Sequence, residues 1–263
     1  MRSLVQIMLI LGSFQCCTKV SISPIPELEN PVSMFAYCQE FPDDWRWRID
    51  YEYYDNNLIS EFRYIGDNLY STTKYEYNES KLLIKKTYER LSSKTETEYI
   101  YNDSNQLIYR IRETVTYNPD GEIHSIVVRE SPLEYENNLL VREWAYWGGL
   151  TTYEYDDDER VVRMNTHTGT GELHHIYYYR YSGDLKTEEE KETVAGKNIY
   201  LRFFEYDSMK RLVRITEDEN TIEENFYTDN KLIERRTYYF GIDPGYDPCY
   251  GNYIYKFEYD KSD

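Results

Sequence analysis

Aromatic and polar residues alternate along this chain in short stretches that recur as far as the C-terminus. In the segment Tyr51 to Tyr53, two rings flank a glutamate. Close copies of this arrangement begin at Tyr75, Tyr99, Tyr153 and Phe204. Side chains two residues apart point to the same face of a β-strand, so both rings share a face and the polar residue lies on the other. The alternation therefore predicts β-strands with one aromatic face and one polar face.

Each copy continues into a polar turn, two apolar residues and a charged tail, which together predict a β-hairpin. Residues 118–121 (Asn-Pro-Asp-Gly) fit a type I turn that closes into a bulge, and residues 137–138 and 183–184 fit two-residue loops with positive φ. Weaker copies centre on Tyr117, Tyr135, Tyr181 and Tyr227, and a last copy begins at Phe257. Because each repeat supplies one hairpin, about ten copies predict about twenty antiparallel strands. The two apolar residues after each turn are adjacent, so they point to opposite faces of the strand. The sequence pattern does not show which of them faces the inside of the barrel.

A sheet of this width is expected to close on itself. Open twisted sheets rarely exceed about ten strands, and a long open meander leaves edges that favour aggregation. The predicted fold is therefore all-β: an antiparallel meander of about twenty strands, closed into a large water-soluble barrel. A flattened two-layer sheet and an open curled sheet are the alternatives. The faces offer Tyr, Thr, Glu, Lys and Arg without a sustained aliphatic band, which disfavours a barrel wall embedded in a membrane.

The amino-acid composition favours β-strands and argues against nucleic acid as a binding partner. The chain of 263 residues contains 31 tyrosines, and aromatic residues make up 17% of it. Tyrosine and threonine suit a pleated, half-buried surface. The formal net charge is −18, and a field of that sign repels phosphate backbones, so nucleic acid is not an expected partner.

The first residues are typical of an export signal. An apolar run over residues 4–11 follows a positive start, is too short to span a bilayer and leads to two adjacent cysteines. We expect residues 1–16 to be a lipoprotein signal peptide. Cys17 is the expected lipidation site, with Cys16 as the alternative, and the lipid chains would attach the protein to a membrane. A cleaved signal without lipid is a further alternative.

The rest of the chain divides into a tether and one domain. Residues 17–36 are assigned to an extended tether, because residues 18–31 are largely polar and contain three prolines. Residues 37–263 are assigned to a single repeat domain. Cys38 and Cys249 lie near opposite ends of that domain, and disulfides persist outside the cytosol. We predict a Cys38–Cys249 disulfide, with two free thiols as the alternative. Such a bridge needs the two Cα atoms within about 7 Å, which suits a closed ring.

The repeat resembles the YD repeat of the rearrangement-hotspot type, which reads Tyr-x-Tyr-Asp-x-x-Gly-Arg-Leu. One copy keeps Tyr206, Asp207, Arg211 and Leu212, and another keeps Tyr153, Tyr155, Asp156 and Arg160. In these copies the glycine is replaced by Lys210 and Glu159, whereas Gly121 preserves it. The whole is similar to small YD-repeat lipoproteins of Bacteroidetes-type bacteria. That resemblance implies a porin-like fold and supplies no catalytic residues.

The resemblance also bears on location. Such bacteria often mark surface-exposed lipoproteins with acidic residues directly after the lipidated cysteine. Residues 18–21 (Thr-Lys-Val-Ser) contain none. The expected location is therefore the cell envelope, with a lipid anchor in the outer membrane and the protein on its periplasmic side.

No residues form a recognisable catalytic, cofactor or metal pattern. The chain has no Gly-x-Ser-x-Gly and no phosphate-binding glycine loop. The adjacent His174 and His175 would point to opposite faces of a strand, which does not suit a zinc site. We therefore expect no catalytic residue, no metal and no cofactor, and we hold a hydrolase as the least favoured alternative.

Paired aromatic residues are the candidate binding residues. By strand alternation Trp45 and Trp47 share one face, as do Trp144 and Tyr146. Aromatic faces beside carboxylates and amides suit sugars or peptides, and the alternative is aromatic packing across strands. The expected function is a non-enzymatic envelope lipoprotein that acts as a β-scaffold for a glycan, a peptide or an envelope partner. A purely structural or assembly component of the envelope is the alternative.

Overall fold

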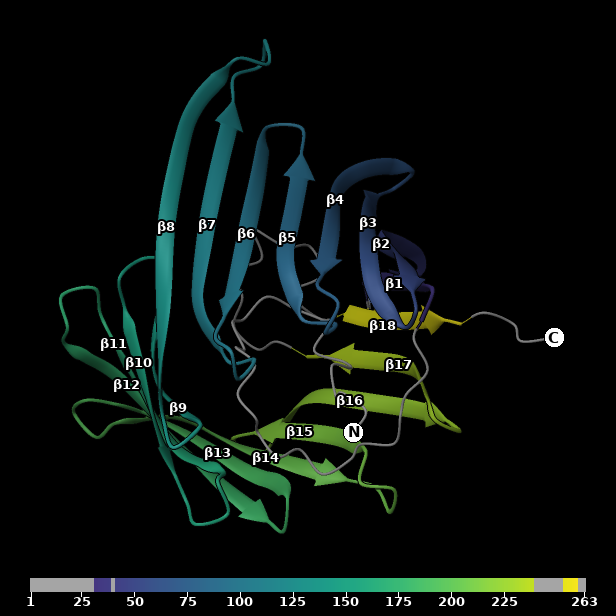
Figure 1. Cartoon of the computed structure of the whole chain (residues 1–263). Coiled ribbons are helices and arrows are strands. Elements are labelled where there is room, and N and C mark those ends of the chain that lie inside the picture. Colours follow the sequence, from purple (N-terminus) through teal and green to yellow (C-terminus); the bar gives the residue numbers. More distant parts are fainter. Residues whose placement is uncertain (1–30, 39–40, 239–252, 260–263) are drawn as a thin grey trace.

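The computed structural model describes residues 31–38, 41–238 and 253–259, and within them it contains eighteen β-strands and no helix (Figure 1). The strands are β1 (Ser33–Cys38), β2 (Phe41–Tyr54), β3 (Asn57–Ile65), β4 (Asn68–Tyr77), β5 (Leu83–Arg90), β6 (Ser93–Tyr101), β7 (Leu107–Tyr117), β8 (Ile123–Glu136), β9 (Leu139–Trp144), β10 (Leu150–Tyr155), β11 (Val161–His167), β12 (Leu173–Ser182), β13 (Leu185–Thr193), β14 (Asn198–Tyr206), β15 (Leu212–Glu217), β16 (Asn220–Thr228), β17 (Lys231–Thr237) and β18 (Tyr253–Glu258).

The strands form one closed antiparallel ring. Each strand pairs with its neighbours in sequence, and β1 closes the ring by pairing with both β2 and β18. This confirms the predicted all-β meander and its closure into a barrel, in place of a flattened or open sheet. The diameter of a barrel grows with its number of strands, so a ring of eighteen strands is wide. Barrels of sixteen to eighteen strands are too large for side chains alone to fill.

With the exception of the copy centred on Tyr117, the repeats place their turns at one end of the barrel, which we call the tyrosine rim. The turns at residues 55–56, 78–81 and 102–105 belong to this rim, and the intervening turns form the opposite rim. Tyr117 ends β7 and leads into a turn of the opposite rim. The copy centred on Tyr117 is therefore out of phase with the others, which explains why about ten predicted copies exceed the repeats that the described strands form.

Turn geometry explains the glycine of the repeat pattern. Gly121 has φ +87°, and its backbone N–H donates to the carbonyl of Asn118 over 2.9 Å, as expected for a type I turn that ends in a bulge. Glu159 and Lys210, which replace that glycine, adopt φ +60° and +62°. The left-handed conformation is thus required at this position even where the residue is not glycine, at some cost in strain. The two-residue loops with positive φ are also confirmed, at residues 137–138 and at Gly183.

A β-bulge after each tyrosine-motif turn determines which faces the two following apolar residues occupy. Tyr53 pairs with Leu58, but Glu52 pairs with Ser60, so Ile59 is an extra residue. The same register shift occurs at the corresponding turns around the ring. The first apolar residue therefore shares a face with the motif tyrosine, and the second occupies the bulge.

The second tyrosine of the motif ties each repeat to the one before it. Its hydroxyl donates a hydrogen bond to a backbone carbonyl just after the preceding turn of the tyrosine rim. The donor and acceptor pairs are Tyr77–Leu58, Tyr101–Leu83, Tyr155–Leu140, Tyr181–Val161, Tyr206–Lys186, Tyr227–Leu212 and Tyr259–Leu232, with O···O distances of 2.7–3.0 Å. Phenylalanine could fill the same space but could not donate, which accounts for the preference for tyrosine.

The aspartate and arginine of the motif form a second connection between repeats. Asp207 accepts hydrogen bonds from the backbone of Met209 and Arg211, and its carboxylate binds the Arg211 guanidinium at 2.7 Å. Arg211 also donates to the carbonyl of Asp229 in the next turn and lies 4.6 Å from the ring centroid of Tyr227. Desolvation acts to raise the pKa of Asp207, but the bonds from Arg211 outweigh it and hold that pKa below its ordinary value.

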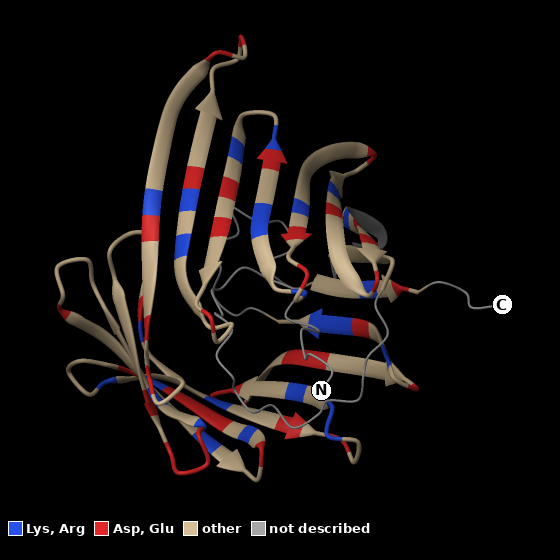
Figure 2. Cartoon of the chain, in the orientation of Figure 1, with Lys and Arg blue, Asp and Glu red and all other residues tan. Residues whose placement is uncertain are grey.

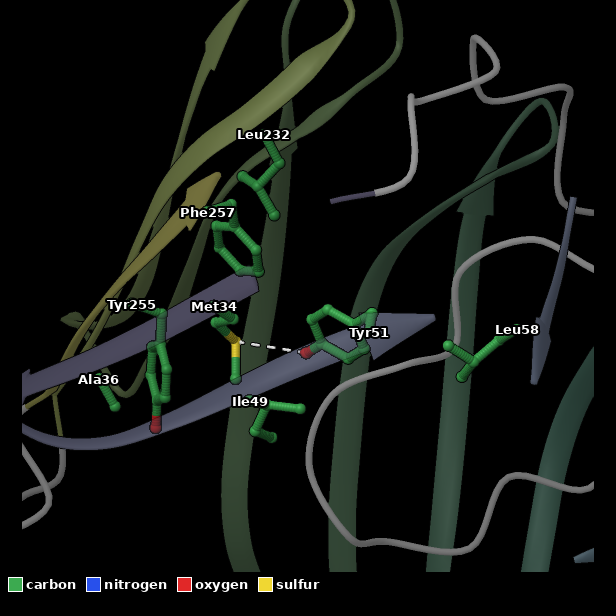
Figure 3. Close-up of a cluster of buried hydrophobic side chains, with 8 residues drawn as sticks. All are labelled: Met34, Ala36, Ile49, Tyr51, Leu58, Leu232, Tyr255 and Phe257. Atoms are coloured by element: carbon green, nitrogen blue, oxygen red, sulfur yellow. Dashed lines mark hydrogen bonds between the residues drawn. The ribbon is translucent and has the colours of Figure 1, made fainter. Parts of the chain in front are cut away.

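The largest buried cluster lies where the ring closes. Met34 and Ala36 of β1 are 1% and 0% exposed and pack with residues of β2, β3, β17 and β18 (Figure 3). The Tyr51 hydroxyl points at the Met34 sulfur, 3.9 Å away. The barrel therefore begins at Ser33, and residues 33–36, assigned to the tether from sequence, belong to the closing strand. The apolar side chains of Met34 and Ala36 fill the seam.

Candidate functional site

Charge is distributed unevenly between the two walls of the barrel. We call the side that carries the motif tyrosines the inner wall, because side chains crowd on the concave side of a ring and these residues are the more buried ones. Partners across a strand pair point to the same side, so the register assigns each residue to a wall. On β3 to β8, the inner wall carries Arg63, Lys86, Arg90, Arg110, Arg112 and Arg129.

The same strands, which the structure describes in full, place almost all of their carboxylates on the outer wall. Glu61 is the single acidic residue of β3 to β8 that faces inwards. The outward ones are Glu76, Glu89, Glu96, Glu98, Glu113, Glu130, Glu134 and Glu136. Figure 2 shows neighbouring bands of Lys and Arg on β7 and β8 and a further band on β5, with acidic bands on β6 between β5 and β7. In a chain of net charge −18, this inner wall is locally basic.

Most of these cations contact neutral groups. Lys86 lies 5.3 Å from the ring centroid of Tyr75, and Arg112 lies 5.6 Å from that of Tyr146. Arg90 donates to the Ser93 hydroxyl over 2.8 Å. Within the described ranges, Lys86, Arg90 and Arg112 form no ion pair with a carboxylate. Their positive charge therefore remains available to a ligand.

Arg112 and Arg129 stand directly opposite each other on β7 and β8. Like charges in this position are destabilising. Arg129 is exposed although it faces inwards, so solvent reaches this part of the inner wall. Short hydroxyl residues surround the pair: Thr97 is the cross-strand partner of Arg112, and Thr114 lies two residues further along β7. An exposed Arg129, a half-buried Arg112 and nearby hydroxyl groups suit an anionic, hydrogen-bonding ligand.

Arg110 belongs to a different, closed arrangement. It is buried and makes an ion pair with Glu143, and it also donates to the Ser131 hydroxyl over 3.0 Å. The Tyr153 hydroxyl donates to the same carboxylate over 3.1 Å. Breaking one partner of a buried pair is strongly destabilising, so this group anchors β7 to β9 and β10.

On the far side of the ring, most inner-wall cations lie beside carboxylates, whereas Lys191 contacts the rings of Tyr177 and Tyr200. Lys186 and Arg202 both approach Glu189, at 2.9 and 3.5 Å, and Arg235 approaches Glu223 at 3.5 Å. Burial acts to raise the pKa of Glu189, but Lys186 and the Tyr200 hydroxyl more than offset it, so this pKa lies below its ordinary value. The unneutralised inner-wall cations therefore concentrate on β5 to β8.

The outer wall is covered by ion pairs between strands. Arg180 contacts Glu188 and Glu190, Arg214 contacts Glu205 and Glu224 at 3.4 and 3.2 Å, and Arg142 contacts Glu134 at 2.9 Å. A lipid-facing wall would need an apolar band in these positions. The outer wall is instead suited to water. No helix in the described ranges has the length and apolar character to cross a membrane.

The structure separates the predicted binding aromatics whose side chains it describes, namely Trp47, Trp144 and Tyr146. Trp47 packs edge to face against Tyr255, with centroids 5.7 Å apart, and is half-buried. The side chain of Trp45 lies outside the described residues. Trp144 and Tyr146 do not share a strand face, because β9 ends at Trp144 and the chain turns there.

Tyr146 and Trp144 have separate surroundings. Glu143 faces inwards, so the adjacent Trp144 points to the outer side. Tyr146 packs over Arg110 and Arg112 at centroid distances of 5.8 and 5.6 Å. Burial raises the pKa of Tyr146, which keeps the phenol neutral beside these two cations. Among the predicted aromatics whose side chains are described, Tyr146 contacts Arg110 and Arg112, and Trp47 lies 5.3 Å from Arg63 at another part of the basic inner wall.

The cysteine predictions fall largely outside the described residues. Cys16, Cys17 and Cys249 lie in ranges that the structure does not describe, and of Cys38 only the backbone, at the end of β1, is described. The disulfide and the lipidation site stay predictions. Among the described residues, no three His, Cys, Asp or Glu side chains gather closely enough to hold a metal ion.

Comparison with known proteins gives distant structural likenesses. No model of a protein family matches the chain, and no curated protein matches it either. A porin-like protein from Bacteroides uniformis is similar over 58% of this chain and 57% of that one, with 16% identity and a TM-score of 0.40. The TcdB2–TccC3–Cdc42 complex and the Photorhabdus luminescens Tc holotoxin pore are each similar over 73% of this chain and 12% of theirs, with 9% identity and a TM-score of 0.28.

This chain thus spans little more than half of the first of these structures and a small fraction of the others. The YD-repeat resemblance accordingly rests on the repeat residues themselves. Their geometry gives each motif position a role in joining one hairpin to the next.

Proposed function

We propose that this protein is an exported, non-enzymatic binding scaffold whose inner wall on β5 to β8 holds an anionic glycan. The observation that carries the proposal is the basic inner wall: Lys86, Arg112 and Arg129 face inwards without a carboxylate partner among the described residues. Neighbouring threonine hydroxyls and the ring of Tyr146 suit sugar hydroxyls and sugar rings. Two other anions fit less well.

Nucleic acid is disfavoured because its dense phosphates would meet the field of a chain with net charge −18. A glycan with one charge every few sugars meets less repulsion. An acidic peptide commonly binds as an added strand, which needs a free edge, whereas the inner wall is the face of a sheet. An anionic glycan, which carries widely spaced charges and many hydroxyl groups, is therefore favoured over nucleic acid and acidic peptides.

The N-terminal sequence supplies the proposed location. We place the protein in the cell envelope, attached through lipid on Cys17 (or Cys16) and facing the periplasm. The charged outer wall supports attachment by lipid rather than insertion of the barrel. Mass measurement of the membrane-extracted protein tests this: lipid should be present in the native chain and absent after Cys17→Ser, and lipid that survives this change would move the site to Cys16.

Two adjacent lysines offer a matched test of the inner wall. Lys86 faces inwards and Lys85 outwards. Lys86→Gln combined with Arg112→Gln removes two inner charges, and Lys85→Gln combined with Arg142→Gln removes two outer ones. Contacts between exposed charges contribute about 0.5–1 kcal/mol each, so the inner pair should weaken binding of polygalacturonate by about tenfold. The outer pair should change it less than about twofold.

Calorimetric titration with polygalacturonate, dextran sulfate and neutral dextran measures this difference. The proposal expects both anionic polymers to bind and dextran not to. Polyglutamate and single-stranded DNA supply comparable charge without sugar hydroxyls. Equal loss of binding in both double variants, equal affinity for polyglutamate, or no binding of either anionic glycan would refute the proposal.

A further inference from the structure

Strand β8 extends well beyond one of its neighbours. β7 pairs with it from Ile123 to Pro132, whereas β9 pairs with it only from Leu133 to Glu136. Residues 123–130 of β8 therefore have a hydrogen-bonded neighbour on one side only. In Figure 1 this part of β8 rises above β9 and β10 as an outer border of the tall wall formed by β4 to β8. Except for Ser125, all of these residues are exposed.

The hairpin that follows β8 shows which of its backbone N–H and C=O groups point towards the free edge. Glu136 and Leu139 flank a two-residue loop, and such flanking residues form a hydrogen-bonded pair. Hydrogen bonding to a given side recurs at every second residue, so even-numbered residues of β8 point their backbone towards the β9 side. Ile126, Val128 and Glu130 therefore present their N–H and C=O groups at the free edge.

From Ser125 to Val128 this edge lacks the features that usually protect one, and the β-bulge at His124 lies at its upper end. Natural edge strands are guarded by lysines, prolines, bulges or short length. Here Ile126, Val127 and Val128 follow one another without a charge and are 55%, 41% and 55% exposed. Pro132, which cannot donate, lies beside the end of β9 rather than within the exposed stretch. An extended, apolar, unpaired edge is a template for another strand.

We infer that the β8 edge pairs with the same edge of a second copy of this chain, antiparallel and about a twofold axis at Val127. The edge is self-complementary in this register. Ile126 stands opposite Val128 of the second copy on the outer side, and Ser125 stands opposite Arg129 on the inner side. The regular pairing covers Ser125 to Arg129, because the β-bulge at His124 ends it. A closed twofold interface uses one patch on both subunits.

Neighbouring registers fit less well. Inward residues must meet inward residues, so the next allowed centres are Ile126 and Val128. A centre at Ile126 would place Val128 of one copy opposite the β-bulge at His124 of the other, which shortens the paired stretch. A centre at Val128 would place Glu130 opposite the apolar Ile126. The register at Val127 is therefore preferred, and it brings Arg129 of each copy beside the other inner wall.

Sedimentation of the full-length protein over a concentration series tests the pairing. The wild type should be a dimer. Val128→Pro removes an edge-facing N–H without touching the β7 ladder, and Ile126→Lys adds a charge at the edge, so both should be monomeric. Ile100→Lys is the matched control, because Ile100 is also exposed on the outer wall but lies in β6, which pairs on both sides. The Ile100→Lys variant should remain a dimer.

A cysteine placed on the axis tests the register. Val127→Cys should form a disulfide-linked dimer on oxidation, because the two copies of this residue face each other, whereas Ile123→Cys should not. A monomeric wild type, a dimer that survives both edge variants, dissociation by Ile100→Lys, or equal cross-linking at Ile123 would overturn the inference. The binding proposal is independent of these outcomes, because a monomer retains the inner wall.

Discussion

The hydrogen bonds between repeats at the tyrosine rim predict a measurable loss of stability when one hydroxyl is removed. In Tyr206→Phe the ring still packs, but the carbonyl of Lys186, 2.9 Å from the hydroxyl, loses its donor. A hydrogen bond of this kind contributes about 1 kcal/mol net, and a partly buried acceptor left without a partner raises the loss towards 2 kcal/mol. For a domain of this size, that corresponds to a fall in Tm of about 2–6 °C. Burial raises the pKa of Tyr206, so the phenol is neutral and able to donate at neutral pH.

Denaturant unfolding followed by circular dichroism measures the effect as a shift in midpoint at unchanged slope. Tyr109→Phe is the control, because the Tyr109 hydroxyl bonds to Glu130 on the exposed outer wall; its midpoint should not move. Tyr77 occupies the same position in a repeat on another part of the ring, so the Tyr77→Phe and Tyr206→Phe losses should add. Equal midpoints for Tyr206→Phe and Tyr109→Phe would show that these bonds do not stabilise the ring.

Three further predictions follow from the turns, the buried phenols and the thiols. Glu159→Gly should raise the free energy of unfolding by about 0.5–1 kcal/mol, because glycine adopts the observed φ of +60° without strain; an unchanged midpoint would contradict this. Burial raises the pKa of Tyr181 and Tyr227 to about 12 from 10.0. The unfolded chain ionises first, so stability should fall as pH rises from 10 towards 12, with absorbance at 295 nm and unfolding changing together; ionisation without unfolding would contradict it. Alkylation should label Cys38 and Cys249 only after reduction, and labelling without reductant would exclude the disulfide.

The architecture was predictable from sequence because its signal is local and repeated. Strand alternation at Tyr51 and Tyr53, with turn chemistry directly after it, recurs often enough to predict hairpins and, through the number of strands, closure. The turn at Gly121 shows the limit. Its chemistry is that of the repeat, yet it lies at the opposite rim, because a turn sequence specifies the local backbone and not the end of the barrel at which it falls.

The inner wall could not be predicted, because its composition depends on register. Lys85 and Lys86 are chemically equivalent neighbours, and the bulge at Ile84 decides which of them faces inwards. A slip of one residue exchanges the walls for a whole strand. The prediction that Trp144 and Tyr146 share a strand face was wrong for a related reason. Alternation holds only within a strand, and the strand ends between them.

Stability and recognition occupy different parts of this barrel. The bonds that join repeats, such as those of Tyr206 and Arg211, lie at the tyrosine rim and repeat around the ring. The features without a structural role, the opposed pair of Arg112 and Arg129 and the unprotected edge at Ile126, lie together on β7 and β8 above the end of β9. Both cost stability in the isolated chain, since like charges repel and a free edge leaves backbone groups unpaired. A ring closed by many equivalent bonds tolerates that cost at one place. This argues that a ligand and a second strand act there, because each would relieve one of these two unfavourable features.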